Sequence, residues 1–295
     1  MFDKAVVCTD LSMDSDTLVG CAGALRVLGL REAVLAHVVD VFADPSGSSV
    51  RSDLAGELFE RQMGMLESCG LAVHVETPVG HPAFSLEEVR KRHGAGLIVI
   101  GGYGKGVFSQ AFSGSISSDL MQLSETPVLV ATMAAFPDGH EPAAVCTQIL
   151  GNVLYCTDFS ETAERAFSVV LGLAGLGAQR FTLAHVQDRE RLESETRSAI
   201  SEYDRRDTVR LIRLREQLTD AGATDVDIQL TYGSPAEELA MSAASGQFSL
   251  IVLGSRGRSA RRLERALGGV SDRVVRDSKT PLLLIPAPRR DQGDY

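Results

Sequence analysis

Residues 97–106 read LIVIGGYGKG, and residues 250–259 read LIVLGSRGRS. Each stretch is a short apolar run rich in Ile, Leu and Val that ends in small and glycine residues. An apolar run of this length followed by glycines indicates a buried strand that leads into a tight loop. Because the same pattern occurs twice in one chain, we interpret the sequence as a repeat of one structural unit.

Four further matches occur in the same order in both halves of the chain. They are AVVCTDLS at 5–12 with VLYCTDFS at 153–160, AHVVD at 36–40 with AHVQD at 184–188, VGHPA at 79–83 with YGSPA at 232–236, and TPVLV at 126–130 with TPLLLI at 280–285. The spacing between matched residues grows along the chain, so the second copy contains small insertions after its second strand and in its glycine loop. We predict two domains, 1–135 and 148–288, joined by a linker that contains Pro and Gly.

Within each copy, apolar runs alternate with amphipathic stretches of helical period, which is typical of βαβ units around a parallel sheet. The predicted strands of the first copy are 4–9, 33–39, 71–76, 97–101 and 127–131. Those of the second copy are 150–156, 180–186, 225–231, 249–253 and 281–285. The Arg- and Glu-rich stretch 188–220 is interpreted as an exposed helix with a solvated, salt-bridged face. The predicted fold class is therefore α/β, with two tandem five-stranded parallel sheets.

The composition limits the class of protein. At 295 residues, with 44% hydrophobic and 23% charged residues, the chain has the size and balance of two compact domains. A formal net charge of −10 and the lack of Trp argue against a nucleic-acid surface. The start MFDKAVVCTD has an acid at its third position and no long apolar run. We therefore expect no signal peptide, no membrane span and a cytoplasmic location.

Cysteine and histidine positions give few signs of special chemistry. The five cysteines include no CxxC pair, so we expect reduced and mostly buried thiols, and we predict no metal cluster. Cys8 and Cys156 precede matching Thr-Asp pairs, where buried packing is the first interpretation and redox sensing the second. His37 and His185 end matching strands. Each is expected to hold its strand to a neighbouring carbonyl, with catalysis as the alternative.

Candidate ligand-binding residues follow the predicted strands at their carboxyl ends, where an open parallel sheet binds its ligands. Asp10 follows the first strand and precedes a helix that begins near Ser12. A helix-capping or turn role for Asp10 and Ser12 is one interpretation, and a carboxylate that accepts a hydrogen bond from a base or a ribose is the other. Gly101 and Gly104 follow the fourth strand, and Gly114-Ser115 precede a helix. Such a loop suits a phosphate, because glycines expose backbone N–H groups and a helix start adds donors. A plain turn is the alternative, since the loop is neither a P-loop nor a GxGxxG fingerprint.

Taken together, these motifs resemble the universal stress protein family along nearly the whole chain, twice over. They are a strand followed by TDxS, a strand ending in HV, a strand followed by GxxG-x9-GS, and TPVLV. GxxG-x9-G[ST] is the ATP-binding signature of that family, and the first copy matches it in full. The resemblance implies a Rossmann-like sheet of the adenine nucleotide alpha hydrolase type, with strand order 3-2-1-4-5. It also implies adenine and ribose near the first two strand ends, phosphates in the glycine loop, and any Mg²⁺ carried by the nucleotide.

The resemblance assigns site residues in each copy. The first site would consist of Thr9, Asp10, Val38, Gly101, Gly104, Gly114 and Ser115, with Lys105 able to neutralise charge. The second site would consist of Thr157, Asp158, Val186, Gly254, Gly257, Gly268 and Gly269. The second loop departs from the signature, because ten residues instead of nine separate its last two glycine positions and Gly269 stands where Ser or Thr is expected. The first site is therefore the better candidate for ATP, or for ADP or AMP.

Three classes of function stay open. The signature loop favours a nucleotide-binding sensor of the stress response, read by an unknown protein partner. A slow ATPase, or autophosphorylation at Ser115 or a neighbouring hydroxyl, would need a positioned base that the sequence does not identify, so we assign no catalytic residue. An interaction scaffold without nucleotide suits the second copy better than the first. Since fifth strands pair between domains in this family, 126–130 and 280–285 are expected to form an intramolecular pseudo-dimer, and a further homodimer is expected.

Overall fold

The computed structural model describes residues 1–40, 52–101, 119–120, 123–131, 148–188, 196–257 and 268–288. The elements of the first half are β1 (Lys4–Cys8), α1 (Met13–Ala24), a short 3-10 helix (Leu25–Leu28), β2 (Glu32–Ala36), α2 (Ser52–Ser68), β3 (Ala72–Glu76), α3 (Pro82–His93), β4 (Leu97–Gly101) and β5 (Val128–Ala131). Those of the second half are β6 (Val153–Cys156), α7 (Glu161–Gly175), β7 (Arg180–Asp188), α9 (Arg197–Asp220), β8 (Asp225–Gly233), α10 (Pro235–Ala244), β9 (Leu250–Gly254), α11 (Gly269–Asp277) and β10 (Leu282–Ile285).

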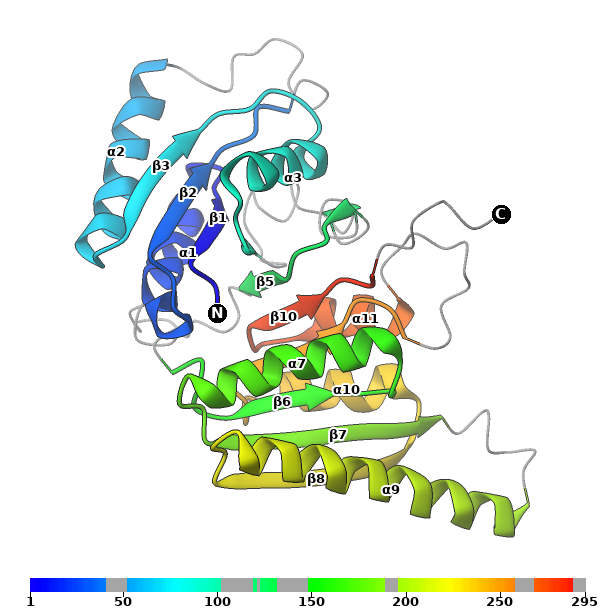
Figure 1. The fold of residues 1–295 in the computed structure, drawn as a ribbon. Coiled ribbons are helices and arrows are strands. Elements are labelled where there is room, and N and C mark those ends of the chain that lie inside the picture. The colour runs from blue at the N-terminus through cyan, green and yellow to red at the C-terminus, as the bar shows by residue number, and fades with distance from the viewer. Residues whose placement is uncertain are drawn as a thin grey trace, which may run out of the picture.

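The ten strands form one sheet in the order β3-β2-β1-β4-β5-β10-β9-β6-β7-β8 (Figure 1). Within each half the described strand pairs are parallel, and the order is 3-2-1-4-5 in both. These observations confirm the predicted fold class and strand order. β5 and β10 pair antiparallel, with Leu283 opposite Leu129, so the two halves meet edge to edge at their fifth strands.

Side chains of the strands fill two hydrophobic cores, one on each face of the sheet. The first core, which includes Val7 and Leu283, packs against α1, α2, α7 and α9. The second core, which includes Val6 and Leu284, packs against α3, α10 and α11. Because both faces of the sheet are covered, its central strands read as continuous apolar runs. Each core draws residues from both halves, so the hydrophobic interior continues across the β5–β10 junction.

Several element boundaries differ from the sequence prediction. The strands expected at 180–186 and 225–231 continue to Asp188 and Gly233, because β7 and β8 pair residue for residue over their whole length. The helix expected at 188–220 begins at Arg197, where the Thr196 hydroxyl caps it by accepting a hydrogen bond from the amide of Ala199 at 3.3 Å. The strand expected at 150–156 begins at Val153, because a turn occupies residues 148–150.

The cysteines only partly follow the expectation. Cys8 and Cys156 are buried free thiols, and burial raises the pKa of Cys156 to about 12 and raises that of Cys8 as well. High thiol pKa values disfavour the reactive thiolate, so packing is the better interpretation of both residues. Cys21, however, is disulfide-bonded, and the expectation of reduced thiols is wrong for it.

In the part of the chain that the structure describes, no helix has the length and apolarity needed to cross a membrane.

Candidate functional site

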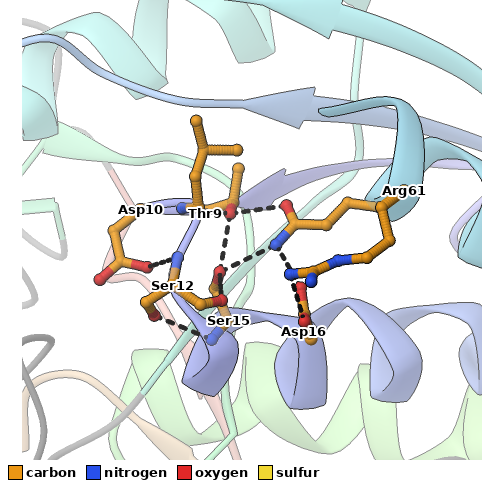
Figure 2. A network of polar contacts seen from close by, with 8 residues as sticks. Thr9, Asp10, Ser12, Ser15, Asp16 and Arg61 are labelled. Atoms are coloured by element: carbon orange, nitrogen blue, oxygen red, sulfur yellow. Dashed lines mark hydrogen bonds and ion pairs between the residues drawn. The ribbon is translucent and has the colours of Figure 1, made fainter. Parts of the chain in front are cut away.

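The turn after β1 is held by its own side chains (Figure 2). Thr9 Oγ1 accepts a hydrogen bond from the amide of Leu11 at 2.9 Å, and Asp10 Oδ1 accepts one from the amide of Ser12 at 2.8 Å. Ser12 in turn caps α1, because its hydroxyl accepts a hydrogen bond from the amide of Ser15 at 3.2 Å. Leu11 has a φ of 63°, a left-handed conformation that residues other than glycine seldom adopt. The turn-forming interpretation of Asp10 is therefore confirmed for one of its two carboxylate oxygens.

The other carboxylate oxygen of Asp10, Oδ2, has a different environment. Asp10 Oδ2 is buried, and no described residue donates a hydrogen bond to it. A buried carboxylate oxygen without a donor is costly, and such groups in folded proteins usually indicate an ion, a water or a ligand that completes them. At the carboxyl end of β1, this oxygen is an acceptor that a hydroxyl or amino group of a ligand would satisfy.

The second half repeats the turn after β6. Thr157 Oγ1 accepts a hydrogen bond from the amide of Phe159, and Asp158 Oδ1 accepts one from the amide of Ser160, both at 3.0 Å. Ser160 caps α7 by accepting a hydrogen bond from the amide of Ala163 at 3.3 Å. Phe159 has a φ of 57°, which matches the unusual backbone of the first turn. The repeat of the sequence is thus a repeat of hydrogen bonds.

The histidines have the structural role expected of them. His37 Nδ1 lies 2.9 Å from the carbonyl oxygen of Thr9, and His185 Nδ1 lies 2.7 Å from the carbonyl oxygen of Thr157. Because a carbonyl can only accept, each imidazole donates from Nδ1. Each ring therefore holds the end of its second strand against the turn that follows the first strand of the same half.

The glycine loop of the second half comes close to the Thr-Asp turn. The amide of Gly268 donates to the carbonyl of Ser255 at 2.9 Å, and a Cβ added to Gly268 would lie 3.8 Å from the backbone N of Gly257. A Cβ added to Gly257 would lie 2.5 Å from Asp158 Oδ2. The structure therefore brings Asp158, Gly257 and the N-terminus of α11 together, and a side chain at Gly257 would displace the carboxylate of Asp158.

In the part of the chain that the structure describes, no side chain caps the start of α11. Its N-cap, Gly268, provides no side-chain hydrogen bond, and nothing lies within 4 Å of a Cβ added to Gly269. The first amides of a helix lack partners within the helix, and the helix dipole is positive at this end. Exposed amides beside open space at a helix start can bind an anion such as a phosphate.

The remaining predicted site residues are placed as follows. Val38 and Val186 are partly buried and pack on the face of the sheet that α3, α10 and α11 cover. Gly101 ends β4 opposite Ala131, and Gly254 ends β9 beside Thr162. Gly104, Lys105, Gly114 and Ser115 lie outside the described residues, so the phosphate half of the first site stays a prediction.

Sequence reasoning missed a polar side chain behind the first turn. Gln62 of α2 is buried, and its Oε1 accepts a hydrogen bond from the hydroxyl of Thr9 at 2.8 Å. Its Nε2 donates to Ser15 Oγ at 3.0 Å and to Asp16 Oδ1 at 2.8 Å. Asp16 also pairs with Arg61 at 2.5 Å, so the network ties α1 and α2 to the turn. In the second half, the buried Asp207 of α9 was likewise not foreseen.

Known proteins share this architecture. The model of the universal stress protein family matches residues 1–132 and 150–286. Universal stress protein MJ0577 of Methanocaldococcus jannaschii is 28% identical over 155 residues, which cover 45% of this chain and 93% of that protein. A putative universal stress protein of Staphylococcus aureus is 30% identical over 144 residues, which cover 45% of this chain and 82% of that protein. The crystal structure of a universal stress protein from Archaeoglobus fulgidus covers 96% of both chains with a TM-score of 0.73 and 21% identity.

The fold and the repeated turn define a tandem α/β protein with a candidate ligand site in each half. The family model matches nearly the whole chain in two consecutive segments. The chain therefore belongs to the universal stress protein family and contains two copies of its domain.

Proposed function

We propose that this protein binds an adenine nucleotide, ATP foremost, and acts as a sensor or regulator in the stress response. Nucleotide occupancy would change a surface that a protein partner reads. The first site would consist of Thr9, Asp10, Val38, Gly101, Gly104, Gly114 and Ser115. The second site, the weaker one, would consist of Thr157, Asp158, Val186, Gly254, Gly257, Gly268 and Gly269. Any Mg²⁺ would arrive with the nucleotide, and we assign no catalytic residue.

The observation that carries this proposal is the buried Oδ2 of Asp10, to which none of the described residues donates a hydrogen bond. The adenosine part of a nucleotide offers donors that suit such an acceptor, namely the amino group of the base and the ribose hydroxyls. The backbone of the turn fixes the other carboxylate oxygen, because the amide of Ser12 donates to it at 2.8 Å. The carboxylate is therefore oriented before any ligand arrives, and this preorganisation lowers the entropic cost of binding.

The second half supports a phosphate position. The uncapped start of α11 adjoins Gly257 and Asp158, and Gly257 allows the loop to approach the carboxylate. The absence of a hydroxyl at Gly269 removes one donor that the family signature provides. We therefore propose weaker nucleotide binding in the second half than in the first.

Further proposals concern the organisation of the chain. We propose domain limits of 1–135 and 148–288, and an intramolecular pseudo-dimer of the two halves, which the β5–β10 pairing supports. A homodimer and a cytoplasmic location stay predictions from the sequence.

Isothermal titration calorimetry with ATP, ADP and AMP in the presence of Mg²⁺ tests the proposal. The intact protein is compared with Gly114→Asp and Gly269→Asp, each of which places a carboxylate where a phosphate is expected. Because nothing lies within 4 Å of a Cβ at Gly269, loss of binding there reports charge and not packing. Gly269→Ser is the matched control, and it is expected to strengthen the second site. Failure of all three nucleotides to bind the intact protein would refute the nucleotide proposal and leave the scaffold interpretation.

A further inference from the structure

In the second half, the ring of His185 connects the Thr-Asp turn to helix α9. Its Nδ1 donates to the carbonyl of Thr157 at 2.7 Å, and its Nε2 lies 3.5 Å from Asp207 Oδ2. Both His185 and Asp207 are buried, with 7% and 4% of their surfaces exposed. The carbonyl and the carboxylate are acceptors only, so a protonated ring would satisfy both, with a hydrogen bond from Nδ1 and an ion pair at Nε2.

Asp207 is itself held from several directions. Gln187 Nε2 donates to Asp207 Oδ2 at 3.1 Å, while Arg206 and Arg210 lie 3.4 and 3.7 Å from Asp207 Oδ1. A buried carboxylate keeps its charge only with such partners. Its position relative to His185 is therefore fixed by both α9 and β7.

His185 and Arg210 also contact the turn at Phe159, the residue that follows Asp158. The Phe159 ring lies 4.6 Å from the His185 ring, and the guanidinium of Arg210 lies over Phe159 at 5.0 Å. Residues 157 and 159 are thus both held by the cluster, and Asp158 lies between them. A movement of Asp207 or of its helix would therefore shift the turn and change the position of the Asp158 carboxylate.

Among its described residues, the first half lacks this connection. His37 makes the matching bond to Thr9, but no described residue forms an ion pair with it, and its ring meets Phe59 edge-on at 6.2 Å. There, α2 reaches the turn through Gln62 and the hydroxyl of Thr9 instead. The carbonyl–imidazole–carboxylate arrangement therefore distinguishes the second site from the first.

We propose that Asp207 is a positioning residue that holds the Thr157–Asp158 turn through His185 and so sets the ligand affinity of the second site. The part of this inference that concerns affinity rests on the proposed nucleotide binding. The part that concerns the turn does not, because the ligand-free protein can test it.

The test compares Asp207→Asn with Asp220→Asn, which makes the same change at an exposed position of the same helix. NMR of the ligand-free protein is expected to show changed amide shifts at Asp158 and Phe159 in the first variant only. The imidazole ¹⁵N shifts of wild-type His185 are expected to report protons on both nitrogens near pH 7. In the Gly114→Asp background, Asp207→Asn should weaken ATP binding at the second site about tenfold, a usual size for coupling between neighbouring groups.

Three results would overturn the inference. The first is a wild-type His185 ring without a proton on Nε2, a measurement that holds even if Asp207→Asn does not fold. The second is unchanged amide shifts at Asp158 in a folded Asp207→Asn protein. The third is unchanged ATP affinity despite shifted amides. If Gly114→Asp alone abolishes all binding, the proposed second site fails, while the NMR comparison still decides whether Asp207 holds the turn.

Discussion

Asp158 and Gly257 lie so close together that a side chain at position 257 would compete for space with the Asp158 carboxylate. A Cβ at Gly257 would meet Asp158 Oδ2, which is the far end of a side chain and can rotate away. A Cβ at Gly254 would instead lie 2.8 Å from Thr162 Cγ2 and 3.4 Å from the Thr162 carbonyl carbon, at the start of α7. The two glycines therefore have different roles, since Gly257 protects the position of a carboxylate and Gly254 allows a strand and a helix to pack.

Replacement of Gly254 by alanine should destabilise the fold. The added methyl group would overlap the β-branched side chain of Thr162, whose Cγ2 and Cβ would lie at 2.8 and 3.2 Å, and overpacking of this kind costs about 1–3 kcal/mol. The matched change Gly269→Ala meets open space and should alter the free energy of unfolding by less than about 0.5 kcal/mol. Urea denaturation of both variants measures the difference. Equal stabilities would mean that β9 and α7 do not pack as closely as described.

At the scale of elements, the sequence predicted the strands well and the polar contacts between different elements poorly. Central strands are apolar runs buried on both faces, and that pattern is visible in one sequence. Asp207 was hidden because it lies in an Arg- and Glu-rich stretch that reads as solvated. Its spacing from Leu211, Leu214 and Leu218 is helical, and this was the signal that it shares their buried face. The partners of such a residue come from other elements and cannot be predicted from its own segment.

The contact between the end of α3 and the edge strand β3 gives a pH-dependent prediction. His93 lies 2.7 Å and Arg92 lies 2.8 Å from the carboxylate of Glu76, and these partners, His93 first, lower the pKa of Glu76. A carboxyl whose pKa is lowered by folding contributes stability above its unfolded pKa, and this contribution is lost as the pH falls through the lowered value.

Glu76→Gln should therefore reduce the free energy of unfolding at neutral pH by up to about 1 kcal/mol, because the pair is partly exposed. The deficit should be smaller at about pH 3 than at neutral pH, because Glu76 is then largely protonated in the unfolded chain and the folded carboxyl approaches its lowered pKa. Chemical denaturation at the two pH values is the measurement. Glu57→Gln, at an exposed residue of α2 for which no described ion pair exists, is the control and should show no pH-dependent difference. A deficit that stays the same at both pH values would contradict the account.

For the whole molecule, the repeat predicted two similar sheets, and the resemblance implied their strand order. That the two sheets form one depends on β5 and β10, where Leu129 and Leu283 are opposite each other and fully buried. No local pattern distinguishes a fifth strand that pairs within the chain from one that pairs with a second molecule. The sequence could not settle this point for the same reason that it could not locate the partners of Asp207, because both depend on contacts between distant segments.

A sheet and two cores that continue across the junction should unfold together. Leu283→Ala removes buried methyl groups at the junction and is expected to cost about 2–5 kcal/mol. Differential scanning calorimetry should show one transition in the wild type and one transition at lower temperature in the variant. Leu176→Ala, at an exposed leucine, should leave the transition nearly unchanged. Two separate transitions, of which Leu283→Ala shifts only one, would contradict a continuous core.

The central claim is that Asp10 Oδ2, which has no donor among the described residues, accepts a hydrogen bond from a nucleotide. The most direct test is the dissociation constant of Mg·ATP for Asp10→Asn, measured by calorimetry in the Gly269→Asp background so that the first site dominates. An asparagine can still accept the hydrogen bond of Ser12 through its oxygen, but it then presents an NH₂ group to the ligand. The account predicts weakening of about tenfold or more, because an acceptor is replaced by a donor. An unchanged dissociation constant would contradict it.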